Sequence, residues 1–266
     1  MKDFGRWIDA HSHLADPRWD LERTQALQEA QSRGIGFFMQ GGVGPDDWTR
    51  QLALKEKHPQ AIGLCFGLHP YWVADHDEEL CEIAIEQLTG VLHKAMGLGE
   101  IGLDLRPHIM KDSLDRQIEF FKLQLELAQA SHLPVVLHLV QAHEEALRIL
   151  DWWGVPPAGA FVHSFNGSAQ KALDFTQRGL YLSVGGPVVR PDNHKLHQAV
   201  LQIPPERLLI ETDSPDQPPP AFAGVKNPPA SLWDVAQKVG ELKGMTPSEI
   251  LDMTSSNFRR LFGVER

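Results

Sequence analysis

The chain has 266 residues, of which 42% are hydrophobic and 23% are charged, and its formal net charge at pH 7 is −10. This composition excludes a disordered or solenoid-repeat protein, and no apolar run approaches the roughly 18 residues that a membrane span needs. The acidic balance argues against a broad basic surface for duplex DNA, because such binding depends on clustered Lys and Arg.

Short apolar runs alternate along the chain with stretches of helical periodicity, which is the rhythm of repeated βα units. The apolar runs predict eight strands, at residues 6–10, 35–40, 61–67, 96–101, 134–139, 159–163, 180–185 and 207–212. Helices are predicted at 19–33, 46–57, 77–93, 113–131, 142–152, 168–178, 192–202, 230–242 and 247–262. Eight parallel strands with outer helices make an α/β fold of the TIM-type (β/α)8 barrel class.

The chain carries no sign of a domain boundary, so residues 1–266 are expected to form one domain. The Pro- and Gly-rich segment 214–229 is too long for a plain connection. Because it follows the last strand, it is expected to form a loop over the catalytic face of the barrel. The opening segment lacks an apolar signal region, and Cys65 and Cys81 match no metal or redox spacing. A soluble, cytoplasmic protein is therefore expected.

Ligand-type side chains stand at the carboxyl ends of five predicted strands. The first strand reads WIDAHSHL, and because strand side chains alternate, His11 and His13 point to the same side. The other four strands supply Glu100, His138, His163 and Asp213. The carboxyl ends of barrel strands converge on one face, so all of these side chains should surround one small volume. One strand histidine alone is usually a hydrogen-bonded core residue, but the joint pattern predicts a metal centre.

This ligand set is too large for one tetrahedral ion, whereas two ions that share a carboxylate would use all of it. We expect Glu100 to be the bridge between two divalent ions, and Mg, Mn and Zn are the candidate cofactors. Such a centre activates a water molecule for attack on an electrophile, and Asp213 is the predicted base. Glu100 and Asp213 are therefore the predicted catalytic residues.

Three further acids are expected to orient the ligands: Asp9 in the first strand, Asp104 just beyond Glu100, and Glu211 in the last strand. Ligating histidines usually donate their second ring N–H to a carboxylate or a carbonyl. For Glu211, an ion pair with a lysine or arginine of the barrel is an equally good interpretation.

The order of these motifs resembles the TatD family of metal-dependent hydrolases, a branch of the amidohydrolase-like barrels. The matching segments are WIDAHSHL, GLHP (67–70), GEIGLD (99–104), LPVVLH (133–138), VHSFNGS (162–168), LLIETDSP (208–215) and NFRRLFG (257–263). The resemblance covers nearly the whole chain. It implies a TIM-type barrel, a divalent-metal centre at the six ligand positions and, for several members, metal-dependent deoxyribonuclease activity.

Substrate recognition departs from this family pattern. Many members follow the fifth-strand histidine with Ser-Arg and an acid, whereas here His138 is followed by Leu, Val and Gln. A guanidinium at that place would bind phosphate in bidentate geometry, so its absence weakens the case for tight nucleotide binding. Arg106 and Arg190 are the candidate replacement cations. The resemblance also places His69, in the GLHP turn, near the substrate.

Three functions remain open on the sequence alone. The first is a deoxyribonuclease acting on single strands or ends, because a site at a barrel mouth reaches a strand end more easily than an intact duplex. The second is hydrolysis of an ester or amide in a small molecule or acylated nucleotide, which the missing arginine favours. The third is a binding barrel without turnover, against which the complete ligand set argues. DNA or a nucleotide is the expected partner, bound only locally, with no membrane and no obligate protein partner.

Overall fold

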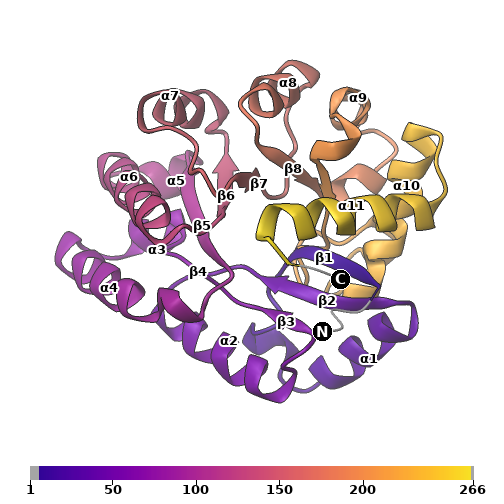
Figure 1. Cartoon of the computed structure of the whole chain (residues 1–266), viewed down its shortest axis with the longest axis horizontal. Helices are drawn as coiled ribbons and strands as arrows, with labels where there is room; N and C mark the ends of the chain where they lie inside the picture. Colours follow the sequence, from indigo (N-terminus) through magenta and orange to yellow (C-terminus); the bar gives the residue numbers. More distant parts are fainter. Residues whose placement is uncertain (1–5, 265–266) are drawn as a thin grey trace.

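Every strand pair in the computed structural model is parallel, and the helices lie around the strands (Figure 1). The structure describes residues 6–264, so both ends of the predicted domain 1–266 lie outside the described residues. The strands are β1 (Trp7–Ser12), β2 (Ile35–Gln40), β3 (Ile62–Gly63), β4 (Cys65–Phe66), β5 (Gly97–Asp104), β6 (Val135–Val140), β7 (Ala160–Val162), β8 (Tyr181–Val184) and β9 (Leu208–Ile210). They are paired in chain order, as a sheet of β1 to β3 and a sheet of β4 to β9.

Helices follow the strands as the sequence predicts, and two short helices, α3 and α5, are additional. The α-helices are α1 (Arg23–Ser32), α2 (Pro45–Lys57), α3 (Pro70–Asp75), α4 (Glu78–Val91), α5 (Pro107–Met110), α6 (Leu114–Ser131), α7 (His143–Trp153), α8 (Ala169–Gln177), α9 (His194–Gln202), α10 (Leu232–Lys243) and α11 (Pro247–Phe262). Short 3-10 turns are η1 (Pro17–Trp19), η2 (Leu92–Lys94), η3 (Gly186–Val189), η4 (Pro205–Arg207), η5 (Pro220–Phe222) and η6 (Pro229–Ser231).

The predicted strand 61–67 is interrupted, which corrects the sequence analysis. Its first part, β3, pairs with β2, and its second part, β4, pairs with β5. The change of partner falls at Leu64, whose carbonyl accepts a hydrogen bond from the N–H of Met96 at 2.8 Å. A continuous apolar run cannot reveal such a change, because both halves are equally buried.

Backbone hydrogen bonds join the two sheets where β9 meets β1. The N–H of Asp213 donates to the carbonyl of His11 at 3.0 Å, and the N–H of His13 donates to the carbonyl of Ser214 at 2.7 Å. These bonds lie just beyond the end of β9, at the carboxyl ends of the strands. The first and last strands therefore present their site residues side by side.

Helix α11 packs against the side chains inside the barrel. Phe258 and Leu261 of α11 share a core cluster with strand residues that include Ile8, Phe37 and Phe161. Figure 1 shows α11 lying across the strands, close to β1. The N–H of Ile8 also donates to Oγ of Ser255 on α11, at 3.0 Å. The helix thus covers the end of the barrel opposite the carboxyl ends of the strands.

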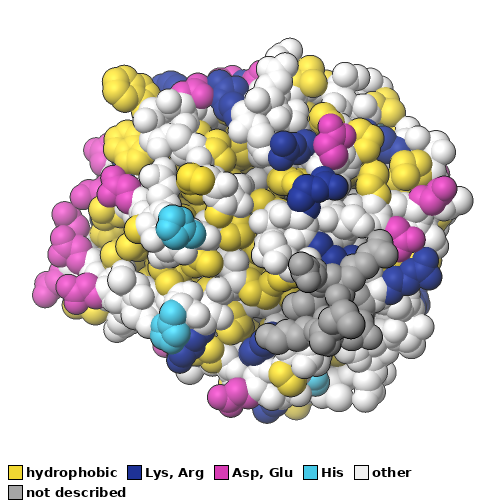
Figure 2. Space-filling model, viewed as in Figure 1, with side chains coloured by type: hydrophobic (Ala, Val, Ile, Leu, Met, Phe, Trp, Pro, Cys, Tyr) yellow, Lys and Arg dark blue, Asp and Glu magenta, His cyan; other side chains and the backbone are white. Residues whose placement is uncertain are grey.

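The outer surface carries many charged side chains. Acidic side chains gather along the edge near α4 in Figure 2, and the exposed acids of that helix are Glu78, Glu79, Glu82 and Glu86. Within residues 6–264, no helix combines the length and the apolar character that crossing a bilayer requires.

Candidate metal centre

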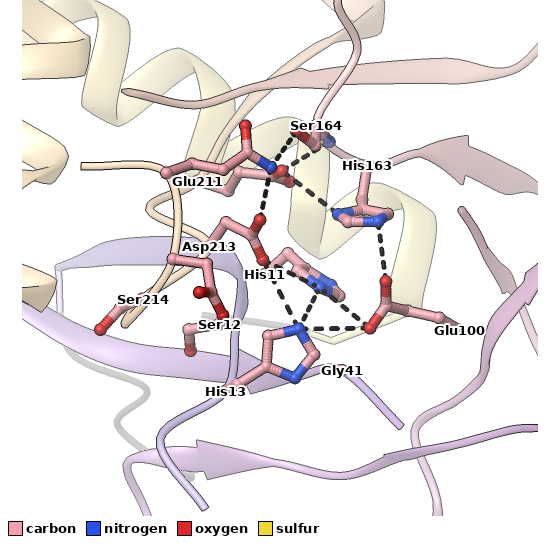
Figure 3. A network of polar contacts seen from close by, with 12 residues as sticks. His11, Ser12, His13, Gly41, Glu100, His163, Ser164, Glu211, Asp213 and Ser214 are labelled. Atoms are coloured by element: carbon pink, nitrogen blue, oxygen red, sulfur yellow. Dashed lines mark hydrogen bonds and ion pairs between the residues drawn. The ribbon is translucent and has the colours of Figure 1, made fainter. Parts of the chain in front are cut away.

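The six predicted ligands lie together at the carboxyl ends of the strands, and Figure 3 labels all of them except His138. Three lie within strands (His11 in β1, Glu100 in β5, His138 in β6). His13 and His163 directly follow β1 and β7, and Asp213 lies three residues beyond the end of β9. The side chains of His13 and His138 are partly exposed, and the other four are buried. Convergence of strand ends therefore brings together residues that are far apart in sequence, as predicted.

The first cluster is formed by Nε2 of His11, Nε2 of His13, Oε1 of Glu100 and Oδ1 of Asp213. The two imidazole nitrogens are 3.3 Å apart. Their distances to the two carboxylate oxygens run from 3.2 to 3.7 Å. Tetrahedral zinc sites with bonds of about 2.0–2.2 Å hold their ligand atoms about 3.3–3.6 Å apart. The five distances are close to that range, so these side chains are placed to hold one divalent ion between them.

The second cluster is formed around the other oxygen of Glu100. Oε2 lies 2.7 Å from Nε2 of His163 and 3.3 Å from Nδ1 of His138, and these two nitrogens are 3.0 Å apart. His69 joins them, with Nε2 at 3.1 Å from Nδ1 of His138 and 3.7 Å from Oε2 of Glu100. His69 is expected near the substrate, and here its Nε2 also lies among the candidate ligand atoms.

Unpartnered buried oxygens and a close backbone approach fit an ion in the first cluster. Oε1 of Glu100 and Oδ1 of Asp213 are buried and have no hydrogen-bond partner among the described residues. Such oxygens are costly unless a donor or a cation compensates them. The loop after β2 presses on the same place, since a Cβ on Gly41 would lie 2.4 Å from Cε1 of His11 and 2.6 Å from Oε1 of Glu100. The donor set of imidazole nitrogens and carboxylate oxygens suits Zn or Mn.

Opposite charges compensate one another within the clusters. Burial opposes ionisation of Glu100, but the imidazoles around it, His163 foremost, hold its pKa well below the usual value. Burial likewise opposes charge on His163 and His13, but Glu100 holds the pKa of His163 well above normal and raises that of His13 to about 9. Burial, reinforced by His138, holds the pKa of His69 well below its usual value. Metal ligation requires neutral imidazoles, so a bound ion would displace protons from His13 and His163.

Two of the three predicted supporting acids face the outer ring nitrogens of ligand histidines. Oδ2 of Asp104 lies 3.5 Å from Nε2 of His138, and Oε1 of Glu211 lies 3.5 Å from Nδ1 of His163. Oε1 of Glu211 also accepts a hydrogen bond from the N–H of Ser164 at 2.5 Å. Contacts of this kind fix the orientation of a ligating ring.

Asp9, the third predicted supporting acid, contacts Thr212 and not the ring of a ligand histidine. Its two oxygens accept hydrogen bonds from Thr212, from the N–H at 2.9 Å and from the hydroxyl at 2.5 Å. Its contact with His11 is to the backbone N–H, at 3.4 Å. Burial raises the pKa of Asp9 to about 8 despite these hydrogen bonds. Asp9 therefore ties β1 to the segment after β9 and does not orient an imidazole ring.

A cavity of about 440 Å³ lies over both clusters. Arg106 lines it, and the Nε of Arg106 donates to the two oxygens of Asp104 at 2.9 and 3.0 Å. Arg190 is exposed just after η3 and is not among the lining side chains. The structure thus distinguishes between the two arginines that the sequence left as alternatives.

Several side chains that line this cavity were not predicted from the sequence, among them Arg18, Tyr71, Ser164 and Gln217. Gln217 donates to Oδ2 of Asp213 at 2.6 Å and to Oγ of Ser164 at 2.5 Å. Each of these four lies two to seven residues beyond the end of a strand, in the segments that form the catalytic face. That position is the one signal in the sequence that could have identified them.

Comparison with known proteins agrees with the metal centre described above. A family model described as TatD related DNase matches residues 8–263. The uncharacterized metal-dependent hydrolase YabD of Bacillus subtilis is 34% identical, over 97% of this chain and 99% of its own length. The 3'-5' ssDNA/RNA exonuclease TatD of Citrobacter rodentium is 28% identical, over 97% and 98% respectively.

A solved structure is also closely similar. The crystal structure of YjjV, a TatD homolog from Escherichia coli K12, matches with a TM-score of 0.90 and 32% identity, covering 98% of this chain and 100% of the other. The similarity confirms the predicted TIM-type barrel, which these relatives share. With its ligand residues gathered at the strand ends, the chain belongs to the TatD family of metal-dependent hydrolases.

Proposed function

We propose that this protein is a deoxyribonuclease that uses two divalent ions, Mg, Mn or Zn, to hydrolyse phosphodiester bonds at the ends of single-stranded DNA. The observation that carries the proposal is the position of Glu100, whose two oxygens belong to different ligand clusters beneath one cavity. Pairs of metal ions are typical of enzymes that displace an oxygen at phosphorus. A relative named as a 3'-5' ssDNA/RNA exonuclease supports the same class of substrate.

Asp213 is the proposed general base. Its Oδ1 faces the histidines of the first cluster, and its Oδ2 is held by Gln217 at 2.6 Å. Its backbone has a φ of 57°, a left-handed conformation that is uncommon outside glycine and is often found at functional sites. When bound, the ions would lower the pKa of a water molecule and stabilise the charge on the leaving oxygen. Asp213 then accepts the proton of that water as the water attacks phosphorus.

Arg106 is the proposed phosphate ligand. Its guanidinium is paired with one carboxylate, that of Asp104, and its side chain is 41% exposed. Arg18, the other arginine of the cavity, is paired with both Asp16 and Asp216. A guanidinium that is less fully neutralised is the better partner for a phosphate group. Binding through one local cation also agrees with a formal net charge of −10, which disfavours binding over a wide surface.

The preference for strand ends rests on a bridge at one side of the cavity. Arg18 donates to the two oxygens of Asp216 at 2.8 and 2.7 Å, and Lys226 donates to the carbonyl of Arg18 at 2.8 Å. These bonds join the segment after β1 to the long loop after β9. We infer that this bridge obstructs a continuous strand lying across the cavity, whereas a terminal nucleotide enters beside it.

A second function, hydrolysis of a small ester or amide, also has one observation in its favour. Leu139 and Val140 give the cavity an apolar section at the end of β6. An apolar section suits an acyl or alkyl group better than it suits a phosphate.

The test is a substrate panel with purified protein in Mg2+, Mn2+ or Zn2+. We expect hydrolysis of linear single strands, much slower hydrolysis of duplexes, and no cleavage of circular single strands. Carboxyl esters and amides should remain intact. Loss of cleavage in Glu100→Gln would exclude a contaminating nuclease. Turnover of esters or amides without phosphodiester cleavage, or cleavage without added metal after chelation, would contradict the proposal.

A further inference from the structure

The lining of the cavity changes character around the barrel. Residues that follow β1 and β9 contribute the acids Asp16, Asp213 and Asp216. The sector from β4 to β6 instead contributes an aromatic ring, Tyr71, together with apolar side chains at the end of β6. Asp16 and Asp216 are paired with Arg18, so the first sector offers groups that are already engaged in ion pairs, and the uncharged parts of a substrate find their partners in the second sector.

Tyr71 is held next to the second ligand cluster. Its backbone N–H donates to Nδ1 of His69 at 3.1 Å, and the centroids of the two rings are 4.0 Å apart with an angle of 46°. The other nitrogen of His69, Nε2, lies 3.1 Å from Nδ1 of His138 in that cluster. The tyrosine ring is thus one imidazole away from the atoms that would hold the reacting phosphate.

A nucleotide has the chemistry that matches this sector. It places an aromatic base a short distance from a phosphate, and here an aromatic ring and apolar side chains adjoin a cationic group, Arg106, and the ligand clusters. Stacking on aromatic side chains is the common way to bind single strands without reading their sequence, because every base has a π-face. A cavity of about 440 Å³ is also in the range of sites for one small ligand.

We propose that Tyr71 is the platform on which the terminal nucleobase of the substrate stacks, with Leu139 and Val140 completing this base subsite. The proposal rests on the nuclease function proposed above. It makes the subsite tolerant of base identity, and it limits occupancy to an unpaired end, since a base within a duplex is already stacked and paired. Base stacking then contributes to DNA affinity, to which the acidic surface of the protein does not contribute.

The experiment is a double-mutant cycle in which one change is made in the protein and the other in the substrate. The variant is Tyr71→Leu, which removes the ring while keeping an apolar side chain, and the second substrate is a single strand with an abasic terminal nucleotide. Binding would be measured by fluorescence anisotropy in Mg2+, with an internally labelled strand whose terminal linkages are phosphorothioates that slow hydrolysis. Trp152→Leu is the matched control, because Trp152 is 87% exposed on α7 and does not line the cavity.

We expect Tyr71→Leu to weaken binding of the ordinary strand about tenfold, as loss of one base–aromatic stack does elsewhere. On the abasic strand the same substitution should cost little, and Tyr71→Phe should restore most of the lost affinity. In hydrolysis, KM should rise while kcat is largely kept. Trp152→Leu should bind as the parent does.

Equal losses on the ordinary and the abasic strand would overturn the stacking proposal, because they would show that Tyr71 acts only through packing on His69. A loss confined to kcat would overturn it as well. If the unmodified protein hydrolyses linear single strands but Tyr71→Leu weakens binding of both strands equally, the nuclease function is supported and the base subsite is refuted. If the unmodified protein neither binds nor hydrolyses single strands, both proposals fall together.

Discussion

Oε2 of Glu100 lies 2.7 Å from Nε2 of His163, although Glu100 lies in β5 and His163 follows β7. The other oxygen of the same carboxylate lies 3.2 Å from Nε2 of His13. One buried side chain therefore contacts both ligand clusters, and its position connects the fold with the proposed chemistry. The substitutions below separate this role from the roles of the neighbouring residues.

The glycine that adjoins the clusters gives the first prediction. In Gly41→Ala the added methyl would lie 2.4–2.6 Å from atoms of His11, His13 and Glu100, so at least one ligand must move. We expect loss of bound metal, measured by elemental analysis of the purified protein, and loss of activity. Gly90→Ala is the control, because a Cβ on this α4 residue meets nothing within 4 Å. That variant should keep its metal, and a Gly41→Ala protein with full metal content would refute the close-packing argument.

The two candidate arginines give the second prediction. Arg106→Gln should raise KM for a linear single strand by about 10-fold to 150-fold, since a charge-assisted hydrogen bond to phosphate contributes about 1.5–3 kcal/mol. Arg190→Gln should leave KM unchanged, because Arg190 is exposed and does not line the cavity. Steady-state kinetics on both variants at one salt concentration provide the check. A larger effect at Arg190 than at Arg106 would show that the wrong arginine was assigned to the phosphate.

The third prediction concerns the long loop after β9. Asn227 is fully buried and donates to the carbonyls of Thr212 at 2.6 Å and of Asp216 at 2.9 Å. It also accepts from the hydroxyl of Ser231 at 2.6 Å. Asn227→Ala leaves several buried groups unpaired and should reduce the free energy of unfolding by about 2–3 kcal/mol. Ser231→Ala removes one bond and should cost about 1 kcal/mol. Urea denaturation of both variants tests the order, which equal losses would contradict.

The fourth prediction is a pH dependence of stability. The ring of His143 packs against Phe165 and Phe175, at 5.4 and 5.6 Å between centroids, and burial, reinforced by Lys195, lowers its pKa to about 4. Below about pH 6.5 the unfolded chain binds a proton at His143 that the folded chain does not bind. The free energy of unfolding therefore decreases as the pH falls from about 6.5 toward 4. At pH 5 this decrease amounts to about 1–2 kcal/mol, a range that allows for the partial exposure of the side chain.

His143→Phe keeps a ring at this place and removes the titration. The free energies of unfolding of the two proteins, measured in urea at pH 7 and pH 5, should therefore diverge on acidification in favour of the variant. A difference that stays constant between the two pH values would show that His143 is not a source of acid sensitivity.

The ligand set could be predicted from the sequence because it depends on one rule, the convergence of parallel strand ends. The His-x-His pair in β1 and the acids and histidines near later strand ends needed no knowledge of loop conformation. His69 is a different case. It caps the N-terminus of α3, and the hydrogen bond from the N–H of Tyr71 to its Nδ1 turns Nε2 toward His138. That orientation depends on where a short helix begins, which periodicity does not reveal.

Loop conformation likewise explains why substrate residues were harder to predict. Arg106 and Arg190 both follow a barrel strand, yet only Arg106 lines the cavity, because Asp104 holds its guanidinium there. Gln217 reaches Asp213 from within the Pro-rich loop, through a fold-back that no motif marks. Asp9 shows the limit of the alternation rule. The pairing of β1 with β2 is irregular between Asp9 and Ser12, and the partner of Asp9 is the backbone N–H and hydroxyl of Thr212, not an imidazole ring.

The most direct test of the account is anomalous diffraction from crystals of the protein grown with MnCl2. The account predicts two peaks on either side of the Glu100 carboxylate, one beside Nε2 of His11 and His13 and one beside Nδ1 of His138 and Nε2 of His163. Both peaks should weaken or vanish in Glu100→Gln. A single peak, or peaks that do not contact Glu100, would contradict the claim that this carboxylate is shared by two ions.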